Sequence, residues 1–368
     1  MGINQLRVPA VVLSTAADVH VALDPAALDA AAEAAEHALL RQGHSDNTAR
    51  SYRSALRYWA AWFQLRYGRV LTPPVAATTV VQFIVDHAQR LDRDGRLVHE
   101  LPPAVDQALV QAHFKARLGA PALSTLVHRV AVLSKVHRVQ ALENPCEQPR
   151  VRDLMARTRR AYAKRGALPH KAAALTRDPL EALLATCDDS LTGLRDRALL
   201  LFAFASGGRR RSELTAATLE NTRRQPGGSY VFELRHSKGN PQGQDRPENH
   251  KPVVGRAAAA LNDWLVASRI TAGPIFRRVR RGSRVGEPLA AAAVRDVVRK
   301  RSKQAGLTAA FTAHSLRSGF VSEAALQGAS LGETMAMTGH RSTAALLGYF
   351  RPVGVTSFAA RLLDTPRR

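Results

Sequence analysis

Helical periodicity fills the first 165 residues of this chain, and it restricts the fold more than any other feature of the sequence. In residues 46–66, Tyr52, Leu56, Trp59 and Phe63 recur at the spacing that places side chains on one helix face. One further helical pattern begins near Asp24. Others cover residues 75–91, 104–118, 121–141 and 148–164. The periodicity therefore predicts a helical domain over residues 25–165, preceded by a flexible arm of residues 1–24.

Residues beyond 165 mix helix and strand signals. Residues 229–236 alternate apolar and polar side chains, and turn-rich residues separate them from a second strand at 250–254, which together predict a hairpin. Helical patterns cover residues 178–187, 193–205, 212–219, 256–268, 289–305, 313–327, 331–338, 343–350 and 356–364. We therefore predict a mostly α fold with a small antiparallel β-sheet in the second domain. The expected order is a basic linker at 166–177, a domain at 178–353 and a C-terminal helix within 354–368.

The charge of the chain narrows the classes of function. Lys and Arg number 53 against 30 Asp and Glu, which gives a formal net charge of +23 and a pI near 11.2. Residues 51–175 carry 20 basic and eight acidic side chains, and residues 176–368 carry 30 and 16. Positive charge in both domains favours a protein that holds a long polyanion from two sides. The two cysteines, Cys146 and Cys187, exclude a disulfide scaffold, and the apolar stretches are too short to predict a membrane span.

Four segments of the second domain carry residues suited to chemistry on phosphate. They are Gly207-Gly208-Arg209-Arg210-Arg211-Ser212-Glu213-Leu214, His314-Ser315-Leu316-Arg317, Thr338-Gly339-His340-Arg341-Ser342 and Tyr349. Each has an ordinary structural explanation when taken alone, because adjacent arginines can start a solvated helix and a tyrosine can belong to the core. Together they place arginines, histidines and a tyrosine in one basic domain.

This combination of residue types favours phosphoryl transfer. Paired guanidinium groups can neutralise the charge that develops on the non-bridging oxygens of a phosphodiester. A tyrosine hydroxyl has a pKa near 10, so only about a thousandth of it is ionised at neutral pH, and it needs a base and a positive field to act as a nucleophile. Histidine and arginine side chains supply both. A lysine at the tip of the predicted hairpin can protonate the departing alkoxide.

The order Arg, Lys, His-x-x-Arg, His, Tyr resembles the tyrosine recombinase (phage integrase) family, and residues 123–142 are similar to its Cre-like branch. By this resemblance, the catalytic residues are Arg210, Lys238, His314, Arg317, His340 and Tyr349, with Glu213 in support. The resemblance extends over residues 25–365. The chain departs from the family pattern where Gly208 and Arg209 replace apolar residues, so Arg209 competes with Arg210 for the first catalytic position.

The resemblance implies a site-specific DNA recombinase that cleaves strands through a covalent tyrosine intermediate. Tyr349 would attack a backbone phosphate to give a 3′-phosphotyrosyl link and a free 5′-hydroxyl. Arg210, Arg317 and His340 would stabilise the pentavalent phosphorane. His314 would act as general base and Lys238 as general acid. No cofactor is implied, neither a metal ion nor ATP.

The partners implied by the resemblance are double-stranded DNA with inverted-repeat recombination sites and further copies of the chain. A free monomer or weak dimer would assemble into a homo-tetramer on synapsed DNA, with residues 354–368 exchanged between protomers. An accessory DNA-bending protein is a further candidate partner. A cytoplasmic, nucleoid-associated location without membrane contact is expected. Candidate DNA-contacting residues in the helical domain are Arg50, Arg53, His128, Arg129, Arg159 and Arg160.

Two other functions remain open on the sequence. A type IB topoisomerase shares the same catalytic residue types and relaxes supercoils without exchanging partners, although the helical N-terminal domain and the helix after the tyrosine favour recombination. A catalytically silent DNA-binding regulator is the other alternative, although all six catalytic positions carry competent residues. The biological role, whether integration, resolution, dimer resolution or cassette movement, is not decided by the sequence.

Overall fold

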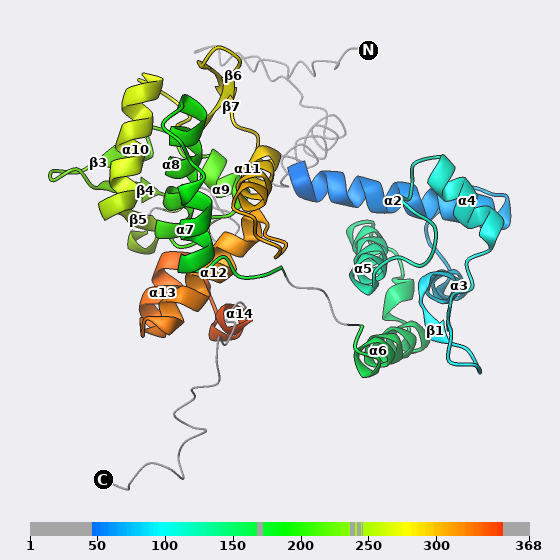
Figure 1. Ribbon diagram of the computed structural model, residues 1–368. Coiled ribbons are helices and arrows are strands. Elements are labelled where there is room, and N and C mark those ends of the chain that lie inside the picture. Colours follow the sequence, from blue (N-terminus) through cyan, green and yellow to red (C-terminus); the bar gives the residue numbers. More distant parts are fainter. Residues whose placement is uncertain (1–45, 168–171, 236–239, 241–243, 245, 349–368) are drawn as a thin grey trace, which may run out of the picture. The chain divides into compact units, whose positions relative to one another are not determined.

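The computed structural model describes residues 46–167, 172–235, 240, 244 and 246–348. The chain divides into two compact units, residues 1–169 (unit 1) and residues 170–368 (unit 2), and Figure 1 shows the elements of each. The division falls inside the segment predicted as a linker. The predicted N-terminal arm, the helix that begins near Asp24 and the helix within 354–368 lie outside the described residues.

Unit 1 is helical, as the periodicity predicts. Its described elements are α2 (Asp46–Tyr67), α3 (Ala77–His87), β1 (Arg90–Leu91), β2 (Leu97–Val98), α4 (Pro103–Gln111), α5 (Leu123–Val139), the 3-10 turn η1 (Pro145–Glu147) and α6 (Pro149–Lys164). Helix α2 packs against α4 and α5, and α3 packs against α5 and α6. Pro149 occupies the first turn of α6, where its missing N–H leaves no hydrogen bond unmade.

Aromatic side chains from α2 and α3 form the core of unit 1. Trp59 stacks on Phe83 with ring centroids 3.6 Å apart, and Trp62 meets the same ring edge-on at 4.9 Å. The indole N–H of Trp62 donates to the buried carboxylate of Asp86 over 2.9 Å. The predicted stripe on α2 is confirmed for Trp59 and Phe63, which are buried, and Trp62 widens it.

Two parts of unit 1 differ from the sequence prediction. Helix α4 ends at Gln111 rather than near residue 118, and the backbone turns at His113, whose φ is 58°. The carboxylate of Asp106 on α4 binds this segment, pairing with Lys115 and accepting from the backbone N–H of Gly119 over 2.8 Å. The Asp106 carboxylate thus holds the segment that follows α4 in a non-helical course. Helix α3 ends at His87, short of the predicted residue 91, and β1 and β2 form a short hairpin after it.

Unit 2 combines helices with two small antiparallel sheets, which confirms the predicted fold class. Its helices are α7 (Arg177–Ala185), α8 (Leu191–Ala205), α9 (Arg211–Thr215), α10 (Gly255–Ser268), α11 (Ala291–Gln304), α12 (Ala313–Leu326), α13 (Leu331–Thr338) and α14 (Thr343–Leu347), with a 3-10 turn η2 (Pro247–Asn249). Its strands are β3 (Thr222–Arg224), β4 (Tyr230–Glu233), β5 (His250–Val253), β6 (Arg277–Arg280) and β7 (Arg284–Pro288). The predicted hairpin is the β4–β5 pair, extended by β3.

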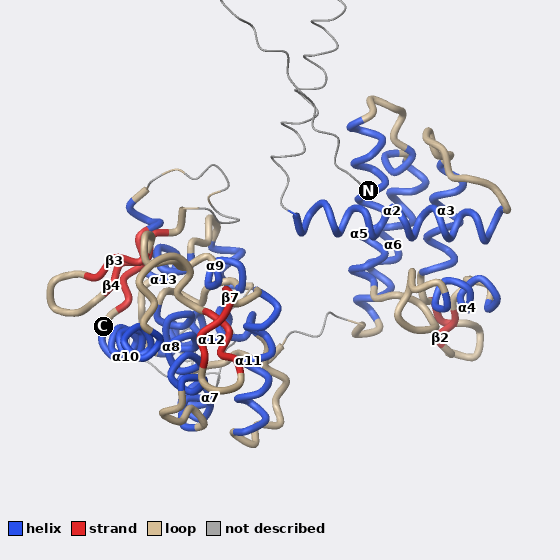
Figure 2. Tube along the Cα trace, turned by 90° about the horizontal axis from the view of Figure 1, so that it is seen from above, coloured by secondary structure: helices blue, strands red, loops and turns tan. Residues whose placement is uncertain are grey.

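Helix α8 is the centre of unit 2. It lies beside α10 and contacts α12, α7 and β5, and Figure 2 shows β3 and β4 next to α10. Phe202 of α8 packs on Phe232 of the sheet and on Phe276. A buried ion network fixes the other side of α8: the carboxylate of Asp196 binds Arg195 at 2.6 Å and Arg301 of α11 at 2.7 Å. Helix α8 is therefore held by the ion network near its start and by Phe202 near its end.

Helix α12 packs closely against the chain segment before α7. The backbone N–H of Leu175 donates to the carbonyl of Ser315 over 2.9 Å. A Cβ at Gly319 would lie 1.9 Å from the carbonyl oxygen of Leu175, so only glycine permits this contact. Among the described residues, no helix has the length and apolar composition that crossing a membrane requires.

Candidate active site

The loop between α8 and α9 and the first turn of α9 bring together Arg209, Arg210 and Glu213. Arg210 is the N-cap of α9; its backbone N–H donates to Glu213 over 3.1 Å, and its guanidinium pairs with the same carboxylate. The side chain of Arg210 is 30% exposed, whereas that of Arg209 is 1% exposed. A substrate phosphate can therefore reach Arg210, and Arg209 lies beneath it.

Glu213 holds its negative charge between these two arginines. Its carboxylate is buried, which opposes ionisation, but the charges of Arg209 and Arg210 outweigh the burial and lower its pKa. Burial has the largest effect on Arg209 and lowers its pKa to about 10, although the charge of Glu213 opposes this. Both groups stay charged at neutral pH, so Arg210 is oriented by a full negative charge.

Arg317 of α12 is buried and reaches two other segments of the site. Its guanidinium donates to the carbonyl oxygen of Gly208 over 3.3 Å and to that of Thr338 over 2.7 Å. One of its nitrogens lies 3.2 Å from Nε2 of His340. Arg317 thus joins α12, the loop before α9 and the end of α13.

His340 follows the C-terminal end of α13, where Gly339 adopts the left-handed conformation with φ 71°. Its Nδ1 lies 2.8 Å from the hydroxyl of Thr338, which itself donates to the carbonyl of Thr334. Because a guanidinium can only donate, Nε2 accepts from Arg317 and Nδ1 carries the proton. Burial, followed by the charges of Arg317 and Arg210, lowers the pKa of His340 to about 4, so it is neutral at pH 7.

His314 lies in the first turn of α12, one turn before Arg317 on the same side. Its backbone N–H donates to the capping hydroxyl of Thr312 over 3.2 Å. Burial and the charges of Arg317, Arg210 and Arg211 lower its pKa. A neutral imidazole with a lowered pKa can accept a proton at neutral pH.

A pocket of about 290 Å³ opens where these segments meet. Its lining includes Arg210, Glu213, Lys251, Gly339 and His340. Lys251 of β5 is buried, and burial is the main influence that lowers its pKa to about 8. Lys251 is not among the residues predicted from the sequence, where its only signal was a charge within the predicted strand at 250–254. Lys238 and Tyr349 lie outside the described residues.

The candidate DNA-contacting residues of unit 1 occupy different environments. Arg50 and Arg53 on α2, and Arg159 and Arg160 on α6, are exposed. His128 lies 2.8 Å from the hydroxyl of Ser51. Arg129 differs from the rest, because its guanidinium stacks 3.1 Å from the ring centroid of Tyr58 and is mostly buried, which lowers its pKa. That contact indicates a packing role within unit 1.

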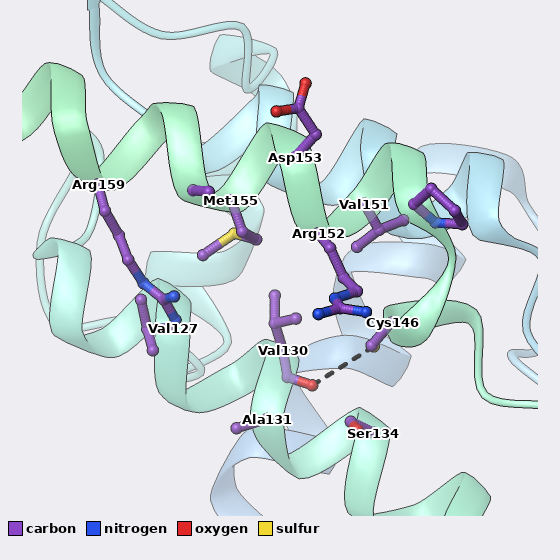
Figure 3. A pocket seen from close by; sticks show the side chains of 12 residues that line it. Val127, Val130, Ala131, Ser134, Cys146, Val151, Arg152, Asp153, Met155 and Arg159 are labelled. Atoms are coloured by element: carbon purple, nitrogen blue, oxygen red, sulfur yellow. Dashed lines mark hydrogen bonds between the residues drawn. The ribbon is translucent and has the colours of Figure 1, made fainter.

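A second pocket, of about 650 Å³, lies between α5 and α6 in unit 1 (Figure 3). Val127, Val130 and Met155 provide apolar walls, and Arg159 extends from α6 beside Val127. The thiol of Cys146 donates to the carbonyl of Val130 over 3.6 Å. The pocket does not contain a catalytic grouping. Within the described ranges, no group of three or more His, Cys, Asp and Glu side chains is arranged to hold a metal ion.

The hairpin of β6 and β7 carries basic residues that the sequence analysis did not single out. Four of its arginines are exposed, namely Arg278, Arg280, Arg281 and Arg284. Val279 and Val285 face each other across the pair and pack on the core of unit 2. With only two apolar residues, the hairpin had no clear strand signal.

His340 makes the stability of unit 2 depend on pH. Its pKa is near 6.5 in the unfolded chain and about 4 in the folded one. As the pH falls through this window, the unfolded chain takes up a proton that the folded site does not, so the free energy of unfolding decreases. We expect a lower Tm of unit 2 at pH 5 than at pH 7, and a smaller difference in His340→Gln. An equal difference in both proteins would contradict the assigned tautomer and its contacts.

Two sequence comparisons match this chain to known proteins. Residues 173–352 match the sequence profile described as the phage integrase family. An integrase/recombinase xerD homolog from Selenomonas ruminantium is 29% identical over 309 residues, covering 82% of this chain and 81% of its own length.

Two solved structures are similar in fold. The Tn1549 transposon integrase in complex with transposon right end DNA is 13% identical, covers 90% of this chain and 97% of its own, and has a TM-score of 0.54. A lambda integrase dimer bound to a COC′ core site is 16% identical, with coverages of 88% and 95% and a TM-score of 0.50. At such identities the likeness establishes the fold alone.

Residues 173–352, which make up most of unit 2, therefore match the phage integrase family. Over most of its length the chain is also similar to a xerD homolog.

Proposed function

We propose that this protein is a site-specific DNA recombinase that cuts and rejoins strands through a covalent link to Tyr349. The observation that carries the proposal is the convergence of Arg210, Arg317 and His340, from three separate segments of unit 2. The family match over residues 173–352 supports the same chemistry.

In the proposed reaction, the hydroxyl oxygen of Tyr349 attacks the phosphorus of a backbone phosphodiester, and the 5′-oxygen leaves. His314 takes the phenolic proton, and Lys238 gives a proton to the departing 5′-oxygen. Arg210 and Arg317 bind the non-bridging oxygens, where negative charge grows in the transition state. Because guanidinium groups supply this charge, the reaction needs neither a metal ion nor ATP.

Binding of the phosphate requires Arg317 to exchange partners. In the free site its guanidinium donates to His340 and to two carbonyl oxygens. A bound phosphate oxygen would replace the neutral acceptors, because a charged acceptor gives a stronger hydrogen bond. His340 can then turn a ring N–H toward the phosphorane. Glu213 keeps Arg210 extended toward the pocket throughout.

DNA is the proposed substrate of both units. Exposed arginines lie on α2 and α6 in unit 1 and on the β6–β7 hairpin in unit 2, and their contacts with phosphates would make binding strongly dependent on salt. The proposed DNA carries inverted-repeat sites, and free monomers or weak dimers assemble on it into a synaptic tetramer. The protomers exchange residues 354–368. The proposal also includes an accessory DNA-bending protein and a nucleoid location. Two similar proteins are described as bound to DNA.

A plasmid assay separates recombination from simple relaxation. The substrate is a supercoiled plasmid with two directly repeated copies of the DNA that flanks the gene, and the control plasmid lacks both copies. We expect two smaller circles from the first plasmid and no change in the second. Relaxation of both plasmids without smaller circles would contradict the proposal and indicate a topoisomerase, whereas binding without any product would indicate a regulator.

A further inference from the structure

Three buried cationic side chains converge on the C-terminal end of α13. Lys251 donates to the carbonyl oxygen of Ala336, Arg209 to that of Met337, and Arg317 to that of Thr338. The three acceptors are consecutive in sequence, while the donors come from β5, the loop before α9, and α12. Figure 1 shows α12 and α13 next to each other in unit 2.

Helix ends explain why these carbonyl groups attract cations. The last carbonyl oxygens of a helix have no intrahelical donor, and the helix dipole gives that end a partial negative charge. Within α13, the N–H of Gly339 closes the final turn on Met335 over 2.8 Å. The three cations supply the donors that the following residues do not.

The loop before α9 fits closely against this end of α13. A Cβ at Gly207 would lie 2.2 Å from the carbonyl oxygen of Met337, so the two backbones are in direct contact. Arg209 follows in the chain, and its guanidinium bridges the carbonyl oxygens of Gly207 and Met337. Its second nitrogen lies 3.7 Å from the carboxylate of Glu213, which also pairs with Arg210.

Lys251 is held equally tightly. It is 1% exposed, and its ammonium group donates to Glu248 of η2 through that residue's carbonyl oxygen as well as to Ala336. Burying an ammonium group is costly unless its donors are satisfied. The contact with Ala336 therefore fixes both the Lys251 side chain and the end of α13.

The end of α13 determines where His340 lies. Only Gly339 separates His340 from Thr338, and the N-cap of α14, Ser342, follows two residues later. A shift of this helix end would move His340 relative to Arg210 and Arg317. A misplacement of about 1 Å in a catalytic site can cost about 100-fold in rate.

We propose that Arg209 and Lys251 are positioning residues, which clamp the end of α13 and thereby place His340 for strand cleavage. This inference rests on the proposed function and adds two residues to it. Arg209 and Lys251 do not contact the DNA phosphate in this account. They act through the backbone of α13.

The test measures single-turnover cleavage at saturating DNA. Arg209→Met and Lys251→Met remove each cation but keep a flexible chain of similar length. We expect each to slow formation of the covalent complex by about 10- to 100-fold, with the Kd for DNA within about twofold of wild type. A loss of Arg209 charge also raises the pKa of His340, which is measurable by NMR of labelled histidine.

Two controls separate positioning from general destabilisation. Phe276→Leu trims a buried core side chain of the same unit, and Lys300→Met removes a positive charge from the exposed face of α11. Neither is expected to change the cleavage rate at saturating DNA or the pKa of His340. Arg209→Lys keeps the charge but loses the second nitrogen that lies near Glu213, so it should give an intermediate rate. It replaces Arg209→Met in the test if that variant does not fold.

The proposal would be overturned by wild-type cleavage rates in both methionine variants, or by a loss that Phe276→Leu reproduces. A loss explained entirely by weaker DNA binding would also overturn it. If the wild-type protein forms no covalent complex, the proposed function fails instead. The clamp is then judged by the backbone amide NMR shifts of Gly339 and His340, and unchanged shifts in both Arg209→Met and Lys251→Met would reject it.

Discussion

Arg317→Lys is expected to lower the rate of covalent complex formation by about 100- to 1,000-fold, the cost typical of losing one donor to a transition-state oxyanion. The guanidinium of Arg317 reaches the carbonyl oxygens of Gly208 and Thr338 and the ring of His340 at the same time. A lysine carries the same charge, but its single ammonium group cannot span these three acceptors or present two parallel N–H groups to a phosphate.

Rapid-quench cleavage of a nicked duplex at saturating protein measures this effect directly. The matched control is Arg256→Lys, because Arg256 makes an exposed ion pair with Glu181 away from the candidate site. We expect the control to cleave at the wild-type rate, since exposed ion pairs contribute little. An unchanged rate in Arg317→Lys, with a normal Tm, would remove Arg317 from the proposed chemistry.

Gly208→Ala should have the second large effect, on folding and cleavage together. Gly208 has φ 69°, and a Cβ there would lie 2.4 Å from the Cα of Arg317. The left-handed conformation lowers the free energy of unfolding by about 1–3 kcal/mol for a residue with a side chain. The overlap with a backbone atom lowers it by a further ~1–3 kcal/mol. To relieve the overlap, α12 must move away from the loop before α9.

Gly227→Ala is the control for this substitution, because Gly227 has φ 87° and open space around its Cα. Urea denaturation of both variants separates the cost of backbone strain, which they share, from the cost of the contact with Arg317. We expect the larger loss of stability, and the loss of cleavage, in Gly208→Ala. Equal losses in the two variants would show that the close packing of Gly208 on α12 does not matter for the site.

The helices of this protein could be predicted because their signal is local. The apolar periodicity of residues 46–66 corresponds closely to α2, and the helical pattern of residues 331–338 corresponds to α13. The β6–β7 hairpin and the early end of α4 could not be found in this way. Each depends on a few side chains, such as Asp106, whose partners lie several residues away.

The candidate site was only partly predictable for a similar reason. The family resemblance selected Arg210, Arg317 and His340, and the structure brings them together. The sequence could not show that Arg209 is buried while Arg210 stays accessible, because the difference arises from contacts with Met337, 128 residues later. Lys251 was missed altogether, since its partner Ala336 is 85 residues away and no motif surrounds it.

Covalent trapping on nicked DNA tests the central claim most directly. Purified protein is incubated in EDTA with nicked duplexes that tile the DNA flanking the gene, and the products are separated on a denaturing gel. The account predicts a protein–DNA adduct on a particular duplex that persists in EDTA, disappears in Tyr349→Phe and yields a phosphotyrosyl peptide containing Tyr349. Tight binding of every duplex with no adduct on any of them, or an adduct that survives Tyr349→Phe, would contradict it.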